Sequence, residues 1–283
     1  MFSYSAAYGE LSAALQHLYD TREAAAIAHA ALEHVTGAGR LQRLTDRDKL
    51  LTAEQAAQFN EIKAGLLSGS PMQYVLGYAW FMGGRFTVNE HVLIPRPETE
   101  ELVQWIVDDS DGLSPSVIDI GTGSGCIPVS LKLLLPQAKV TATDISEGAL
   151  AIAKKNAGLL GADVQFINAD FLDTGTWQEL GQFDIIVSNP PYIPDTEKET
   201  LGAHVREHEP GQALFVPGND ALLFYRHIAD FAQEHLAEGG AVYCELHVDY
   251  AAATQELFRS MGYTHTELRT DMHGNLRMLK AKK

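Results

Sequence analysis

The spacing of hydrophobic and polar positions changes twice along the chain. Residues 1–70 carry apolar side chains at helical spacing, with a break at Gly37-Ala38-Gly39 and a capping-box pattern at Thr52-Ala-Glu-Gln55. Residues 71–95 are rich in aromatic and β-branched side chains punctuated by glycines, which is typical of one or two hairpins. We therefore predict a helical N-terminal domain over 1–70 and a β-hairpin linker over 71–95.

From residue 96 to residue 283, short apolar runs alternate with helical patterns. The expected strands are Val117–Ile120, Val140–Thr143, Val164–Ile167, Phe183–Val187, Ala241–Leu246, Thr264–Leu268 and Leu276–Lys280. The expected helices are Ile127–Leu135, Gly148–Leu159, a short piece at Trp177–Leu180, and Leu222–Ala237. Such alternation predicts an α/β domain with a doubly wound, mostly parallel sheet. Only a turn-like segment, Asp271–Gly274, separates the last two strands, so we expect the final strand to be antiparallel.

Composition narrows the possible partners. The chain has 283 residues, of which 46% are hydrophobic, enough for a sizeable core. Its 21 Lys and Arg stand against 37 Asp and Glu, for a net charge of −16. Because a protein that binds phosphate backbones needs a basic face, this charge argues against direct contact with nucleic acid. The basic end, Lys280–Lys283, is interpreted as a solvated tail.

Location is predicted from what the sequence lacks. We find no apolar run of membrane-spanning length and no secretory signal pattern, so we expect no membrane association. Cys126 and Cys244 lie in apolar runs without metal-ligand spacing, which indicates buried free thiols and suits a reducing cytoplasm. No metal site is predicted, and we expect a monomer.

Two of the expected strands end in residues suited to a nucleoside. Gly121-Thr122-Gly123-Ser124-Gly125 follows the first strand, where glycines let the backbone approach a ligand and a helix begins. A tight turn without a ligand is the alternative. Asp144 ends the next strand, where an acidic residue accepts hydrogen bonds from ribose hydroxyls. Alternatively, Asp144 caps the helix that starts at Ser146.

The next two strand ends complete the same edge of the sheet. Asp170 offers an acceptor for an adenine amino group, and Phe171 an aromatic face for the ring; a polar loop is the alternative. Asn189-Pro190-Pro191-Tyr192 follows the strand Phe183–Val187, and its prolines hold the backbone of Asn189 extended. A flat group with an NH2 and a C=O fits beside the Asn189 carboxamide. A strand ending in a Pro-Pro turn is the alternative.

Ligands of open α/β sheets bind outside the carboxyl ends of the strands, so these four segments are expected to form one site. No phosphate-binding GxxxxGK[ST] motif is present, and no basic residue lies near the glycine turn. A nucleoside without phosphates therefore fits best, and S-adenosylmethionine has the required ribose and adenine. The segment Pro194–Asn219 is long for a βα connection, and we expect it to frame the opening of the site for a protein loop.

With this cofactor, the C-terminal part resembles a class I methyltransferase. Asn189-Pro190-Pro191-Tyr192 is similar to the motif of enzymes that methylate planar NH2 groups on adenine, guanine or glutamine. A set of segments together resembles the HemK/PrmC family: Pro71–Gly77, Leu93–Glu100, Ser188–Ile193, Glu209–Leu214 and Asp271–Arg277. That family methylates the side-chain N5 of the glutamine in the GGQ motif of peptide chain release factors. The resemblance spans about residues 70–280.

The resemblance implies a role for each site residue. Gly121 to Gly125 would line the amino-acid end of S-adenosylmethionine, Asp144 would hold the ribose and Phe171 would cover the adenine. Asn189 would contact both cofactor and substrate glutamine, with Pro190-Pro191-Tyr192 completing the substrate slot. Residues 96–283 would then be the methyltransferase domain, and residues 1–70 would dock the substrate.

Three other functions share these features. A glutamine methyltransferase of a ribosomal protein is a close sibling. An adenine or guanine methyltransferase of nucleic acid shares the motif and the fold, but the charge of −16 argues against it. A catalytically idle S-adenosylmethionine-binding regulator is a further alternative, against which the intact motif argues.

Overall fold

The computed structural model describes residues 2–110, 112–200 and 202–283. The chain divides into two compact units, Met1–Gly77 and Tyr78–Lys283. Each has its own buried core. Within the described residues, no helix is both long enough and apolar enough to cross a membrane.

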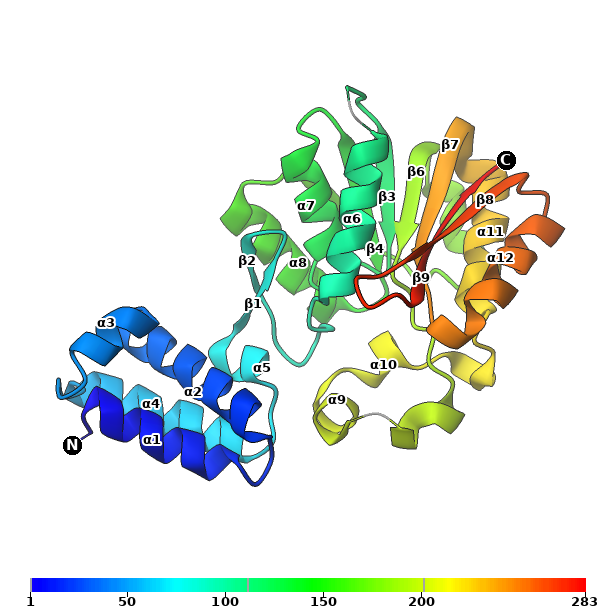
Figure 1. The fold of residues 1–283 in the computed structure, drawn as a ribbon. Coiled ribbons are helices and arrows are strands. Elements are labelled where there is room, and N and C mark those ends of the chain that lie inside the picture. Colours follow the sequence, from blue (N-terminus) through cyan, green and yellow to red (C-terminus); the bar gives the residue numbers. More distant parts are fainter. Residues whose placement is uncertain (1, 111, 201) are drawn as a thin grey trace. The chain divides into compact units, whose positions relative to one another are not determined.

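The first unit is helical, as its apolar spacing predicts (Figure 1). Its elements are α1 (Tyr4–Leu15), α2 (Thr21–Thr36), α3 (Arg40–Thr45), α4 (Ala53–Leu67) and α5 (Met72–Leu76). The helix α5 lies at the start of the segment 71–95, where only a β-hairpin was expected. Apolar side chains from one face of the longer helices fill its core, among them Leu11, Leu15, Leu32, Phe59 and Leu66. The capping box predicted at Thr52 and Gln55 is confirmed at the start of α4. Gly37 ends α2 in the left-handed conformation, which a glycine adopts without a steric cost.

The second unit begins with a hairpin and continues as a seven-stranded sheet. The hairpin pairs β1 (Tyr78–Phe81) with β2 (Gly84–Thr87). The sheet has the order β5-β4-β3-β6-β7-β9-β8. Its strands are β3 (Ser116–Ile120), β4 (Lys139–Asp144), β5 (Val164–Asn168), β6 (Phe183–Ser188), β7 (Leu236–Glu245), β8 (His265–Thr270) and β9 (Leu276–Lys282). All neighbours pair in parallel except β9, which is antiparallel to β7 and β8, so the predicted α/β sheet is confirmed.

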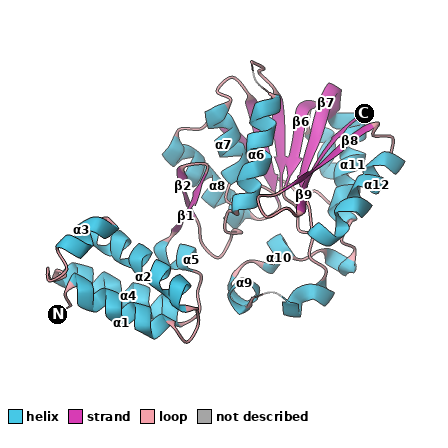
Figure 2. Cartoon of the chain, viewed as in Figure 1, coloured by secondary structure: helices cyan, strands magenta, loops and turns pink. Residues whose placement is uncertain are grey.

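Helices cover both faces of this sheet (Figure 2). One face packs against α6 (Pro97–Asp109), α7 (Cys126–Leu134), α8 (Glu147–Leu160) and the hairpin. The other packs against α11 (Leu223–His235) and α12 (Ala251–Ser260). Successive residues of a strand point to opposite faces of the sheet. In β3, Val117 therefore belongs to the core on the first face and Ile118 to the core on the second. Cys126 and Cys244 are free and buried, as predicted, and burial raises the pKa of the Cys126 thiol to about 12.

Connections of 3₁₀ and short helical turns complete the unit. They are η1 (Thr174–Glu179), η2 (Asp195–Thr200), α9 (Ala203–His208), α10 (Gly211–Leu214), η3 (Pro217–Asn219) and η4 (Val248–Tyr250). The chain leaves β3 to form β4 and β5 on one side, then crosses to β6 on the other side of β3. A sheet of this kind opens a crevice at the carboxyl ends of the strands beside that reversal.

Candidate active site

A cavity of about 520 Å³ lies at this crevice. All of its lining residues belong to the second unit, between Glu90 and Phe224. The sequence-predicted residues that line it are Gly121, Thr122, Gly123, Ser124, Asp144, Asp170, Phe171, Asn189, Pro190 and Pro191. Four segments separated by up to about 70 residues of sequence are thus brought together. Gly125 and Tyr192 are the predicted residues outside this lining.

The glycine turn after β3 is shaped for a close ligand. Gly121, Gly123 and Gly125 have φ angles of 75°, 55° and 77°, which residues other than glycine rarely adopt. A Cβ at Gly121 or Gly123 would face open space, so these two leave room on the cavity side. A Cβ at Gly125 would lie 3.0 Å from that of Ala153, so this glycine serves the packing of α7 on α8. Gly125 is the N-cap residue of α7, and because it has no side chain, no side-chain cap satisfies the first backbone N–H groups of this helix.

Buried polar atoms without partners lie at the same turn. The Thr122 hydroxyl and both carboxylate oxygens of Asp119 are buried, and none has a hydrogen-bond partner among the described residues. Burial and, to a smaller extent, the nearby Asp144 carboxylate raise the pKa of the Asp119 carboxyl to about 7, whereas the neighbouring Thr122 hydroxyl acts to lower it. Orphaned polar groups beside a cavity are what a polar or cationic ligand would satisfy. The turn therefore fits the ammonium- and carboxylate-bearing end of S-adenosylmethionine.

Asp144 links the turn to the adjoining strand. Its carboxylate accepts hydrogen bonds from the Gly123 N–H (2.8 Å) and the Ser146 N–H (2.9 Å). The side chain that caps α8 is Ser146, which accepts from the Ala149 N–H, so the capping alternative for Asp144 is wrong. Burial raises the pKa of Asp144, and the three backbone N–H groups around it favour the charged form.

Asp170 and Phe171 line the cavity in different ways. Asp170 accepts a hydrogen bond from the Leu172 N–H at 3.0 Å. The Phe171 ring is buried in the core, with its centroid 5.3 Å from that of Trp177 and 5.4 Å from that of Phe231. Phe171 therefore offers an apolar wall to the cavity while its ring packs in the core.

Asn189 lies where this cavity adjoins a second one of about 180 Å³. The residues that line both are Leu93, Arg96, Asn189, Pro190 and Ala213. Tyr192 lines only the second cavity, which also includes Val205 and Leu214 from the long connection after β6. The predicted framing of the site by the segment 194–219 is borne out to this extent: several of its residues line one cavity or the other.

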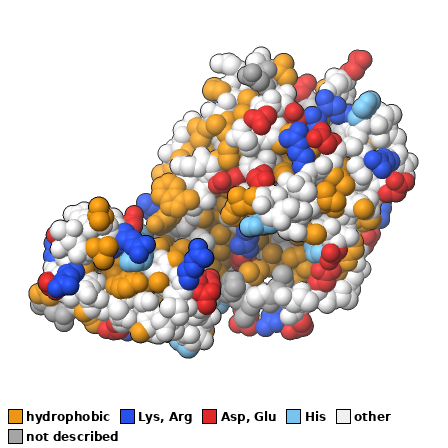
Figure 3. Space-filling model, in the orientation of Figure 1, with side chains coloured by type: hydrophobic (Ala, Val, Ile, Leu, Met, Phe, Trp, Pro, Cys, Tyr) orange, Lys and Arg blue, Asp and Glu red, His pale blue; other side chains and the backbone are white. Residues whose placement is uncertain are grey.

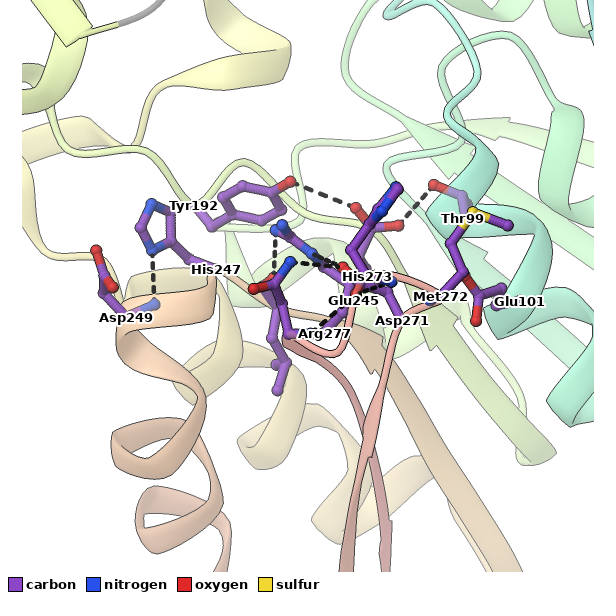
Figure 4. A network of polar contacts seen from close by, with 12 residues as sticks. Thr99, Glu101, Tyr192, Glu245, His247, Asp249, Asp271, Met272, His273 and Arg277 are labelled. Atoms are coloured by element: carbon purple, nitrogen blue, oxygen red, sulfur yellow. Dashed lines mark hydrogen bonds and ion pairs between the residues drawn. The ribbon is translucent and has the colours of Figure 1, made fainter.

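The buried carboxylate of Glu245 connects Thr99, which lines the larger cavity, to Tyr192, which lines the smaller one (Figure 4). Glu245, at the end of β7, accepts hydrogen bonds from the Thr99 hydroxyl (2.6 Å) and the Tyr192 hydroxyl (3.3 Å). Thr99 in turn accepts from the Asn189 side-chain nitrogen at 3.2 Å. Burial raises the pKa of Glu245, whereas the positive charge of Arg277 favours its ionised form. Burial also raises the pKa of Tyr192, which keeps its hydroxyl protonated as a donor.

A second buried carboxylate, that of Glu209, was likewise not predicted from the sequence as part of the site. A guanidinium nitrogen of Arg96 lies 2.6 Å from a carboxylate oxygen of Glu209. Glu209 also accepts from the Ile94 N–H at 3.1 Å. Both residues belong to segments that carry the family resemblance, Leu93–Glu100 and Glu209–Leu214. The presence of both segments was the only sign in the sequence that they are functionally related, and it did not show that Arg96 pairs with Glu209.

The comparisons with solved structures support the fold. The hMettl16 catalytic domain aligns with a TM-score of 0.54 and 19% identity, covering 84% of this chain and 85% of that one. A methyltransferase from Pyrococcus furiosus aligns with a TM-score of 0.52 and 19% identity, covering 81% of this chain and 98% of that one. Residues 98–213 match the family model described as Methyltransferase small domain. The second unit therefore has the fold of class I methyltransferases, and the match to a methyltransferase model identifies S-adenosylmethionine as the cofactor.

Sequence relatives narrow the class. Residues 7–77 match the model described as PrmC N-terminal domain. A protein of Flavobacterium psychrophilum is 42% identical over 272 residues, which is 94% of each chain, and one of Bacteroides thetaiotaomicron is 41% identical over 267 residues, 94% of this chain and 95% of that one. Both are named release factor glutamine methyltransferase. The chain belongs to this family, which confirms the resemblance seen in its motifs, and it is a protein glutamine methyltransferase.

Proposed function

We propose that the protein transfers a methyl group from S-adenosylmethionine to the side-chain N5 of the glutamine in the GGQ motif of peptide chain release factors. The observation that carries this proposal is the position of Asn189 and Pro190 on the wall shared by the two cavities. A cofactor in the larger cavity and an amide in the smaller one would meet at these residues. The names of the relatives support release factors as the substrate class.

In the proposed mechanism, this chain positions a weak nucleophile. The nitrogen of an amide is a poor nucleophile because its lone pair is delocalised into the carbonyl group. The Asn189 side-chain oxygen and the Pro190 carbonyl each accept one N–H of the substrate amide and so direct its lone pair. S-adenosylmethionine, when bound, supplies an electrophilic methyl group. The prolines fix the backbone of both acceptors in advance, so little reorganisation accompanies the reaction.

The binding roles of the remaining residues belong to the same proposal. The turn Gly121–Gly125 holds the amino-acid end of the cofactor, and Asp144 accepts from the ribose hydroxyls. Asp170 accepts from the adenine amino group, against the apolar wall of Phe171. After transfer, the methylated nitrogen loses a proton to water or a nearby acceptor, and no dedicated base is needed.

The proposal also assigns the parts of the chain. Residues 1–70 dock the release factor, residues 71–95 link this domain to the next one, and residues 96–283 carry out methyl transfer. The helical first unit offers its own compact core, which is suited to a docking module. A monomer and a cytoplasmic location stay predictions.

Charge supports a protein substrate over nucleic acid. The net charge is −16, and on the face shown in Figure 3 the Lys and Arg side chains lie in small groups mixed with Asp and Glu. Binding to a phosphate backbone gains from a continuous basic surface. A ribosomal-protein glutamine remains the second candidate, because the same amide chemistry would serve it.

One reaction tests the proposed function. The enzyme is incubated with methyl-labelled S-adenosylmethionine and a purified release factor that carries either GGQ or GGA. Label on the GGQ protein alone, retained after nuclease treatment, is expected. Label on both proteins would place the methyl elsewhere. Label found instead on ribosomal protein or RNA from added ribosomes, with none on the release factor, would contradict the proposal.

A further inference from the structure

The Asn189 side chain stands at the end of a chain of hydrogen bonds that begins at Glu245. The Glu245 side chain is buried, and each of its carboxylate oxygens accepts from one hydroxyl, Thr99 on one side and Tyr192 on the other (Figure 4). The Thr99 oxygen then accepts from the Asn189 side-chain nitrogen. Thr99 is itself 2% exposed, so water does not compete for its hydroxyl.

The direction of each hydrogen bond follows from proton counting. An ionised carboxylate only accepts, and a threonine hydroxyl has one proton to donate. Because Thr99 gives that proton to Glu245, its oxygen is left as an acceptor. Of the two ends of the Asn189 carboxamide, only the NH2 end can donate to it. The carboxamide oxygen is thereby turned away from Thr99, and no described residue donates a hydrogen bond to it.

We propose that Thr99 and Glu245 are positioning residues, which hold the Asn189 carboxamide with its oxygen available to the N–H of the substrate amide. The inference rests on the proposed function. The reverse orientation would present the NH2 of Asn189 to the NH2 of the substrate, two donors with no acceptor between them. Neither Thr99 nor Glu245 needs to touch the substrate for this effect.

Kinetics of matched threonine variants test the proposal. Thr99→Val keeps the shape but removes the hydroxyl, whereas Thr99→Ser keeps the hydroxyl. Loss of one orienting hydrogen bond is expected to lower kcat roughly tenfold in Thr99→Val. KM for the release factor and the affinity for S-adenosylmethionine are expected to change less than about twofold, and Thr99→Ser is expected to restore kcat.

A control of the same chemistry is available on another helix. Thr254 in α12 is also fully buried, and its hydroxyl donates to the carbonyl of Tyr250, the residue before this helix, and not to Asn189. Thr254→Val should lower stability without changing kcat. Equal kcat in the wild type and Thr99→Val would overturn the proposal, as would a loss that Thr99→Ser fails to restore.

A spectroscopic measurement tests the orientation independently of any substrate. The side-chain N–H signals of Asn189 are assigned by their loss in Asn189→Asp. In the wild type, the N–H donated to Thr99 is expected to exchange with solvent roughly tenfold more slowly than the side chain of the exposed Asn60. Exchange of both Asn189 protons at the Asn60 rate would overturn the inference. Slow exchange in an enzyme that methylates no release factor would instead retain the orientation and reject the proposed function.

Discussion

Arg96 and Glu209 are 113 residues apart in sequence, yet a guanidinium nitrogen and a carboxylate oxygen lie 2.6 Å apart. The Glu209 side chain is 1% exposed and that of Arg96 is 33% exposed. The pair joins the segment that enters α6 to the long connection after β6, and both segments line the cavities. This contact therefore fixes two walls of the site against each other.

Removing the Arg96 charge should destabilise the second unit. Arg96→Met leaves the buried Glu209 carboxylate with the Ile94 N–H and no cation. Loss of one partner of a buried pair costs about 3–5 kcal/mol, and the partial exposure of Arg96 lowers the expectation to about 1–3 kcal/mol. Denaturant unfolding followed by tryptophan fluorescence measures it, because Trp80, Trp105 and Trp177 all lie in this unit.

A more exposed pair provides the control for Arg96. Arg226 and Asp220 lie 2.9 Å apart, with side chains that are 42% and 44% exposed. Arg226→Met should cost less than about 1 kcal/mol. Equal losses in the two variants would show that the Arg96–Glu209 contact has no special structural weight.

Asn189→Ala tests the proposed acceptor directly. The variant loses the carboxamide oxygen that would orient the substrate N–H. By analogy with removal of one preorganised polar group, single-turnover methyl transfer should fall by about 100-fold or more. The affinity for S-adenosylmethionine should change far less, which calorimetry measures. A variant that transfers methyl at the wild-type rate would remove Asn189 from the mechanism.

Asp144→Ala should weaken cofactor binding. Charge-assisted hydrogen bonds contribute about 1.5–3 kcal/mol, so a loss of roughly tenfold to a hundredfold is expected. Asp144 also accepts from Gly123 and Ser146, so the variant alone could act through the turn. A cofactor analogue without ribose hydroxyls separates the two effects.

The analogue should bind the wild type and Asp144→Ala with similar affinity if the carboxylate acts through the ribose. An exposed acidic residue, Asp163, supplies the matched control, because Asp163→Asn should leave both affinities unchanged. If Asp144→Ala weakens the analogue as much as the natural cofactor, Asp144 only shapes the turn.

The folded-state pKa of Asp119, about 7, makes stability depend on pH. Its ordinary value is 3.8, so between these two the folded protein holds a proton that the unfolded chain has lost. The contribution of Asp119 to the free energy of unfolding is therefore present at low pH and falls as pH rises, by up to about 1.4 kcal/mol per pH unit.

Asp119→Asn should remove this part of the pH dependence. Unfolding monitored by tryptophan fluorescence between about pH 4 and about pH 8 measures it for the protein without cofactor. The stability of Asp119→Asn relative to the wild type should increase with pH, whereas Asp163→Asn should retain the wild-type slope. Parallel curves for the wild type and Asp119→Asn would show that the buried carboxyl does not titrate in this range.

Strand ends were predictable because they depend on local pattern. The apolar run before Ser188 and the prolines after Asn189 mark a buried parallel strand and a stiff exit whatever surrounds them. Parallel neighbours then bring their carboxyl ends to one edge of the sheet, so the sequence alone was enough to group Gly121, Asp144, Asp170 and Asn189.

Partners from distant segments could not be predicted in the same way. Thr99 meets Glu245 across 146 residues, and this contact depends on how α6 lies against the end of β7. The position of Tyr192 beside the smaller cavity depends on the same packing. No local pattern encodes either distance.

The predicted start of the strand β7 was also wrong, because it too depends on contacts with a neighbouring strand. A helix was expected to continue to Ala237, but it ends at His235 and β7 begins at Leu236. Gly239 and Gly240 are poor strand formers, which hid this part of the strand. A Cβ at Gly240 would lie 2.7 Å from the Asp184 carbonyl oxygen, so close approach of the neighbouring strand requires the glycine.

In the proposed function, the methyl acceptor is the side-chain amide of one glutamine in a release factor. Tandem mass spectrometry of the release factor after reaction with wild-type enzyme measures this most directly, with Asn189→Ala enzyme as the control. We predict a single added methyl on the side-chain nitrogen of the GGQ glutamine, formed by the wild type and greatly reduced with the variant. A methyl on any other residue, or an unmodified GGQ glutamine after complete reaction with the wild type, would contradict the account.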